Sequence, residues 1–73
     1  MKFDPQSFEN QIVALTRDGR RVQFDSSDRT NSLFPLLGRI EGDVFPTSYR
    51  IDGGHTGLPY IRSNCDLVEM VAQ

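Results

Sequence analysis

Six glycines and four prolines are spread along this chain at intervals that fit short strands and tight turns. Glycine permits positive φ angles, and proline lacks the backbone N–H that regular structure needs. The apolar runs between them, such as residues 12–15, are only a few residues long, whereas a membrane-spanning helix needs about 20. We therefore expect a small all-β fold with no membrane partner.

The length of the chain sets the number of domains. Its 73 residues suffice for one domain but not for two, because domains typically have about 100–150 residues. We expect a single domain over residues 1–73, with residues 1–10 as a loosely attached N-terminal segment in which Asp4 and Pro5 start one helical turn. The formal net charge is −2. This acidic balance argues against a general nucleic-acid clamp, which carries a basic excess.

Hydrophobic alternation and turn residues predict about five short antiparallel strands. Asp18-Gly19 is the strongest hairpin signal, and Pro35 marks an edge or the start of a strand. The predicted strands cover residues 11–16, 21–25, 33–41, 45–51 and 66–71, and residues 58–61 are expected to pair back across a turn at 52–57. Residues 66–71 also have apolar residues at helical spacing, but so short a segment favours a strand. A chain this small must curl to bury its apolar face, so we expect an SH3-like partly open barrel or a curled antiparallel sheet.

The aromatic and aliphatic residues at strand spacing form the expected core. We predict that Phe24, Phe45, Tyr49 and Ile51 are mostly buried, with Val13 or Leu15 facing them. Phe3, Phe8 and Tyr60 have less structural reason to be buried. Exposed aromatic residues beside arginines are typical of protein interfaces and of surfaces on which bases stack.

The residue counts exclude several chemistries. Cys65 is the one cysteine and His55 the one histidine, so neither an intrachain disulfide nor a zinc site of four Cys and His ligands is possible. His55 has no matching nucleophile in the sequence, and we interpret it as a solvated loop residue and Cys65 as a small packing residue. We therefore expect no catalytic residue, no metal and no cofactor, and hence no enzyme. The lack of disulfides indicates the cytoplasm.

Arginine makes up seven of the eight basic residues, and Arg17, Arg20 and Arg21 lie together at the first hairpin. The planar guanidinium group suits carboxylates, phosphates and aromatic rings. We predict Arg17, Arg20, Arg21 and Tyr60 as partner-binding residues, in contact with an acidic protein surface or with a phosphate backbone. The alternative is that the arginines pair with Asp18, Asp25 and their neighbours on the sheet surface.

The order of several short motifs resembles a group of small proteins encoded by bacteriophages and prophages. These motifs are Phe3-Asp4-Pro5, Thr16-Arg17-Asp18-Gly19-Arg20, Phe34-Pro35-Leu36-Leu37-Gly38, Tyr49-Arg50-Ile51-Asp52-Gly53 and Asp66-Leu67-Val68. The chain departs from the pattern in its loop at 26–32 and in the extra residues 54–57. The resemblance implies a small β domain of phage or prophage origin, and it assigns no catalytic residue.

These observations lead to two functional hypotheses. The first is a non-enzymatic phage or prophage accessory protein that binds a host or phage protein in the host cytoplasm, for example to inhibit a host enzyme or defence system. The alternative is a small nucleic-acid-binding module that uses the hairpin Arg17–Arg21. In either case, open sheet edges would allow a homodimer.

Overall fold

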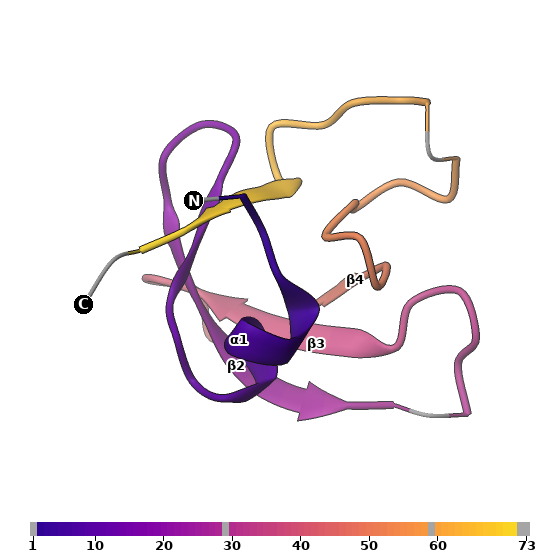
Figure 1. Ribbon diagram of the computed structural model, residues 1–73, viewed down its shortest axis with the longest axis horizontal. Coiled ribbons are helices and arrows are strands. Elements are labelled where there is room, and N and C mark those ends of the chain that lie inside the picture. The colour runs from indigo at the N-terminus through magenta and orange to yellow at the C-terminus, as the bar shows by residue number, and fades with distance from the viewer. Residues whose placement is uncertain (1, 29, 59, 72–73) are drawn as a thin grey trace.

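The computed structural model describes residues 2–28, 30–58 and 60–71. These residues form one short helix and five strands: α1 (Pro5–Glu9), β1 (Ala14–Thr16), β2 (Arg21–Ser27), β3 (Leu36–Ile40), β4 (Thr47–Tyr49) and β5 (Leu67–Met70). The strands make one sheet in the order β4-β3-β2-β1-β5, and every neighbouring pair is antiparallel. The sheet curls around the core and is crossed by α1 (Figure 1). The predicted all-β fold with a curled antiparallel sheet is confirmed.

The β1–β2 hairpin turns at the predicted Asp18-Gly19 pair. The amide of Gly19 donates to the Thr16 carbonyl at 2.9 Å, and the amide of Thr16 donates to the Arg20 carbonyl at 2.8 Å. Gly19 has φ +89°, which is the left-handed conformation that closes a three-residue hairpin loop. Thr16 is buried although it is polar, and its hydroxyl accepts the Arg20 amide at 2.8 Å.

Phe8 fastens the N-terminal segment onto the sheet. The Asp4 side chain caps α1, as predicted, and accepts from the Gln6 amide. The Phe8 side chain is fully buried, and an added Cβ at Gly38 of β3 would lie only 2.8 Å from its ring. Residues 2–10, which we expected to be loosely attached, therefore pack on the sheet, and Phe8 is a core residue instead of a spare aromatic.

The predicted core is right for Tyr49 and wrong for two other residues. Tyr49 is fully buried and Phe24 packs partly buried against the core, but Phe45 is 80% exposed and Ile51 is 56% exposed. The expected strand over 45–51 is only three residues long. Pro46 precedes it and has no N–H for the ladder. After the strand the chain turns, with the Gly53 amide donating to the Arg50 carbonyl at 2.9 Å, and Ile51 lies outside the sheet.

The register of β1 and β5 differs from the expected alternation. Ala14 and Thr16 are buried, whereas Val13 and Leu15 are only half-buried, so the inward face of β1 is one residue out of phase with our prediction. Residues 66–71 contain the predicted strand, but a bulge interrupts its pairing with β1. This bulge places Leu67 and Met70 on the same buried face although they are three positions apart. The helix-like spacing in the sequence is the signature of this bulge.

The chain from β4 to β5 partly closes the barrel, and we call its residues 50–58 and 60–66 the seam. The amide of Leu67 at the start of β5 donates to the Gly53 carbonyl at 2.8 Å. Residues 58–61 do not form the expected strand: the Ile61 amide donates to the Leu58 carbonyl in a tight turn, and residue 59 lies outside the described residues. The outer edge of β5 is covered in part, because the Phe3 amide donates to the Val68 carbonyl at 3.2 Å.

Candidate functional site

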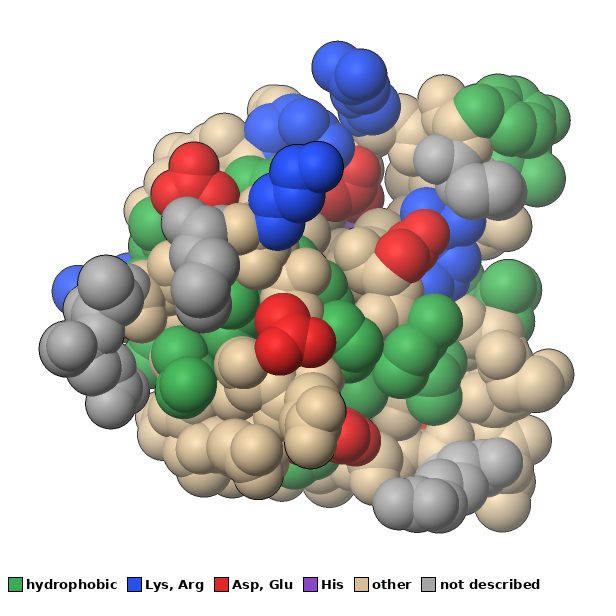
Figure 2. Space-filling view, in the orientation of Figure 1, with side chains coloured by type: hydrophobic (Ala, Val, Ile, Leu, Met, Phe, Trp, Pro, Cys, Tyr) green, Lys and Arg blue, Asp and Glu red, His purple; other side chains and the backbone are tan. Residues whose placement is uncertain are grey.

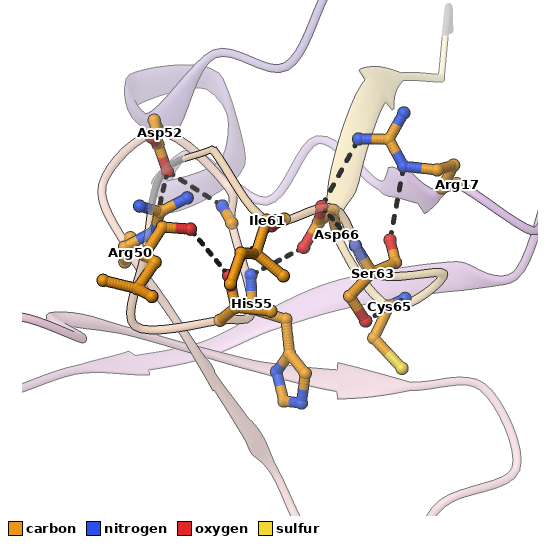
Figure 3. Close-up of polar contacts among 11 residues, drawn as sticks. Arg17, Arg50, Asp52, His55, Ile61, Ser63, Cys65 and Asp66 are labelled. Atoms are coloured by element: carbon orange, nitrogen blue, oxygen red, sulfur yellow. Dashed lines mark hydrogen bonds and ion pairs between the residues drawn. The ribbon is translucent and has the colours of Figure 1, made fainter.

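Asp66 is buried, and its carboxylate forms hydrogen bonds to several parts of the seam. Its carboxylate accepts hydrogen bonds from the His55 amide at 2.8 Å, from the Ser63 amide at 2.9 Å and from the Arg17 guanidinium at 3.3 Å (Figure 3). Burial alone raises the pKa of Asp66, but these hydrogen bonds and the Arg17 charge outweigh it, and the pKa lies below its ordinary value. The ionised carboxylate therefore ties the first hairpin to two points of the seam, His55 and Ser63.

A second polar group lies at the other end of the seam, around Arg50. The Arg50 side chain is only 11% exposed, and its guanidinium lies against Gly54, where an added Cβ would overlap it. Asp52 Oδ1 accepts the Gly54 amide at 2.9 Å and lies 3.4 Å from Arg50 Nε. The buried Nε makes no hydrogen bond to the described residues. A glycine at position 54 is thus required for the guanidinium to lie flat on the backbone.

These two groups line a hollow of about 180 Å³ between the first hairpin and the seam. Its charged lining comes from Arg17, Arg50, Arg62, Asp52 and Asp66. Figure 2 shows blue basic and red acidic side chains side by side along this upper part of the molecule. The hollow has an excess of guanidinium groups over carboxylates, so it suits an anionic group.

Three large apolar side chains are exposed in the segment of the seam that contains the hollow-lining residue Ile61. Leu58 is 46% exposed, Tyr60 78% and Ile61 44%, and Ile61 also lines the hollow. The Thr56 hydroxyl lies 2.8 Å from the Leu58 carbonyl and 2.9 Å from the Ile61 carbonyl, which holds the loop in a compact shape. Among its described residues, the seam therefore presents three exposed apolar side chains that lie close together in the sequence.

The four sequence-predicted binding residues do not share one face. Arg17 lines the hollow and Tyr60 belongs to the same seam. Arg20 instead folds onto Asp18, with Nε 3.0 Å from Oδ1, and Arg21 lines a different hollow of about 270 Å³ between β2 and the β3–β4 turn. The expected common outward cluster of Arg17, Arg20 and Arg21 does not form, because Arg17 pairs with Asp66, Arg20 pairs with Asp18 and Arg21 lines the other hollow.

His55 and Cys65 belong to the structural frame of the seam. The His55 ring is half-buried, with Nδ1 3.3 Å from the Ser48 carbonyl and its centroid 5.9 Å from that of Tyr49, so the expectation of a solvated histidine is wrong. The Cys65 sulfur is half-buried and lies 3.3 Å from an Arg20 nitrogen. Both side chains point away from the hollow in Figure 3.

Two further properties limit what the described residues can do. No group of three or more His, Cys, Asp and Glu side chains in residues 2–28, 30–58 and 60–71 is placed to hold a metal ion. Within the same residues, no helix has the length and apolar character needed to cross a membrane. Comparison of the chain with protein-family models, curated proteins and solved structures finds no match.

Sequence reasoning missed Arg50, Asp52, Arg62 and Asp66 as members of the site. They are separated along the chain and meet only because the seam returns to the start of β5. The sequence Asp52-Gly53-Gly54 could have indicated this site, because two adjacent glycines leave space over a backbone turn for a large side chain such as that of arginine. Asp66 was missed because two of its three partners, His55 and Arg17, lie 11 and 49 positions away, and only Ser63 is close to it in the sequence.

Proposed function

We propose that this protein is a non-enzymatic binding module that recognises another protein through the seam. The observation that carries the proposal is the exposure of Leu58, Tyr60 and Ile61 in one short segment of the seam, together with the position of Ile61 in the lining of the arginine-rich hollow. Binding energy at protein interfaces is concentrated in a few residues, among which tyrosine and arginine are enriched. The hydrogen bonds from Thr56 to the Leu58 and Ile61 carbonyls restrict the backbone at these two residues, which lowers the conformational entropy lost there on binding.

The phage or prophage origin rests on the sequence resemblance alone. A small protein of that origin would act in the host cytoplasm by occupying a surface of a host or phage protein, for instance one of a host enzyme or defence system. The apolar seam next to guanidinium groups supports such a surface-occupying role.

Nucleic-acid binding is the second candidate function. The arginines of the hollow could contact phosphates and Tyr60 could stack on a base. The net charge of −2 and the two aspartates in the hollow weigh against it. The apolar side chains of Leu58 and Ile61 are also better suited to a protein surface than to a phosphate backbone.

The test is affinity capture from a host-cell lysate with tagged wild-type protein and two double variants. Leu58→Ser with Tyr60→Ser, the seam variant, removes two of the three exposed apolar side chains of this segment and leaves the hollow-lining Ile61 unchanged. Val44→Ser with Phe45→Ser is the matched control, because these side chains are 77% and 80% exposed but lie in the β3–β4 connection. A protein that is captured by the wild type and the control, lost with the seam variant and unaffected by nuclease supports the proposal.

Two results would contradict this assignment. Equal capture by the seam variant would place the binding surface elsewhere on the molecule. Loss of the captured protein after nuclease treatment would instead support nucleic-acid binding. Circular dichroism of each variant checks that the fold is retained.

A further inference from the structure

Some of the charged groups that line the hollow have hydrogen-bond partners within the described part of the protein, and others do not. Asp66 already accepts two backbone amides and Arg17, and Asp52 accepts the Gly54 amide. Among the described residues Arg62 forms no ion pair. Arg50 Nε lies 3.4 Å from Asp52 Oδ1 as an ion pair, but this contact lacks hydrogen-bond geometry, so the buried Nε has no hydrogen-bond acceptor among those residues. Charged donors of this kind are best satisfied by a further anionic acceptor.

The size and surroundings of the hollow restrict that acceptor. A hollow of about 180 Å³ is large enough to admit a small polar group in place of several water molecules. A carboxylate side chain fits this space, and a guanidinium group matches its planar shape. Ile61 lines the hollow and is also part of the exposed apolar loop, so an anion here lies directly beside apolar surface.

We infer that the hollow recognises the carboxylate of an Asp or Glu side chain on the partner protein, flanked there by apolar residues. Arg50 and Arg62 donate to this carboxylate, while Arg17 is held in place by Asp66. The flanking apolar residues contact Leu58, Tyr60 and Ile61. This inference rests on the proposed protein-binding function and names the chemical class of the segment that is bound.

Phosphate is a weaker match on two grounds. Asp52 and Asp66 line the same hollow, and they would repel the greater negative charge of a phosphate more strongly than that of a carboxylate. A nucleic-acid strand would also need further cations at regular spacing along its backbone. The neighbouring surface carries Leu58, Tyr60 and Ile61 instead.

The experiment is an NMR titration of ¹⁵N-labelled protein with two blocked tripeptides, acetyl-Leu-Glu-Leu-amide and acetyl-Leu-Gln-Leu-amide. The Nε–H signals of Arg50 and Arg62 and the amide signal of Gly54 report on the hollow. We expect the Glu peptide to shift these signals and to bind at least about tenfold more tightly than the Gln peptide, the factor that one charge-assisted hydrogen bond supplies.

Arg62→Gln should reduce binding of the Glu peptide by about tenfold and leave binding of the Gln peptide unchanged. Arg39→Gln is the matched control, because Arg39 is an exposed arginine that pairs with Asp25 on the sheet. Equal binding of the two peptides, or equal losses for the two variants, would overturn the inference. Tighter binding of inorganic phosphate or of an oligothymidine strand to the same arginines would overturn it in favour of a phosphate site.

The two experiments distinguish a failure of the carboxylate-site inference from a failure of the proposed protein-binding function. If the peptides show no carboxylate preference but the Leu58→Ser, Tyr60→Ser variant still loses its captured protein, the protein-binding function stands and the carboxylate site does not. If the seam variant captures its partner normally, the proposed function fails, whatever the peptides do.

Discussion

The carboxylate of Asp66 lies 3.3 Å from the guanidinium of Arg17, which is 49 positions earlier in the chain. The Asp66 side chain is 9% exposed and that of Arg17 is 39% exposed, so the pair sits at the boundary between core and solvent. Through it the β1–β2 hairpin is joined to the seam, which carries no strand of its own. Backbone hydrogen bonds from the Arg17 amide to the Asp66 carbonyl and from the Asp18 amide to the Asn64 carbonyl join the same two parts, and the Asp66 carboxylate adds the charged contact between them.

Replacing Asp66 with asparagine should destabilise the protein by about 1–3 kcal/mol, because a buried acceptor of charged and amide donors is weakened. Arg17 is partly solvated, so most of this loss comes from the backbone amides of His55 and Ser63. Urea unfolding followed by circular dichroism measures the change. Asp43→Asn, at an exposed turn residue, is the control and should stay within about ±0.5 kcal/mol of wild type. Equal midpoints for both variants would contradict the role of Asp66.

The same carboxylate predicts how stability depends on pH. The pKa of Asp66 is lower in the folded protein than its ordinary value of 3.8, so near pH 4 the unfolded chain binds more protons than the folded one. Stability from this group is therefore complete above the unfolded pKa and is lost as the pH falls through the folded pKa. Unfolding free energies measured from pH 7 to 3 should decline below about pH 4, and the decline should be shallower for Asp66→Asn. A variant that declines as steeply as wild type would assign the effect to Asp4, Asp18 or Asp28, whose pKa values are also lowered by neighbouring hydroxyls.

Phe8 and Phe45 test the reassigned core. Phe8→Ala should cost about 3–5 kcal/mol, because the ring is fully buried and packs edge-on against Phe24 at 5.5 Å. For a domain of this size the total stability is roughly 4–11 kcal/mol, so the variant should lose a large share of it. Phe45→Ala should stay within about ±0.5 kcal/mol, since its ring is 80% exposed. Thermal melts compare the two variants. A larger loss of stability for Phe45→Ala than for Phe8→Ala would mean that Phe45, as predicted from the sequence, belongs to the core and Phe8 does not.

The predictable part of this fold is the part determined by local chemistry. Asp18-Gly19 forms its turn and Pro35 directly precedes β3, because φ preferences and a missing N–H act within a few residues. The burial of Phe8 was not predictable in this way. It depends on the space above Gly38, and a glycine within a strand can equally indicate a bulge or a bend.

The candidate site was less predictable than the fold. Arg17, Arg20 and Arg21 are close in the sequence, and we predicted from this that they form one binding surface. Side chains on the two arms of a hairpin share a face only if the register of the strands places them opposite each other. In the structure, ion pairs and strand phase separate them. The residues that do meet at the hollow come from the hairpin, the seam and the start of β5, and only tertiary structure assembles such a set.

Gly38 should be intolerant of even one methyl group. An added Cβ would lie 2.8 Å from the Phe8 ring, 2.8 Å from Val22 and 3.3 Å from the Tyr49 ring. We expect Gly38→Ala to destabilise the protein by about 1–3 kcal/mol through overpacking. Gly57→Ala is the matched control, since its nearest neighbour would be Leu33 at 4.0 Å. Urea midpoints decide the matter, and a Gly38→Ala protein as stable as the control would mean that α1 can shift without loss.

Gly19 separates backbone strain from steric overlap. Its φ is +89°, yet an added Cβ would meet no atom within 4 Å, so any loss on substitution comes from the backbone conformation alone. Gly19→Val should cost about 1–2 kcal/mol, because a β-branched residue strongly disfavours the left-handed region. Gly19→Asn should cost clearly less, since asparagine adopts that region more readily. If thermal melts show equal losses for valine and asparagine, strain at the turn is not the cause, and if neither residue lowers the melting temperature, the hairpin does not need the left-handed conformation at this position.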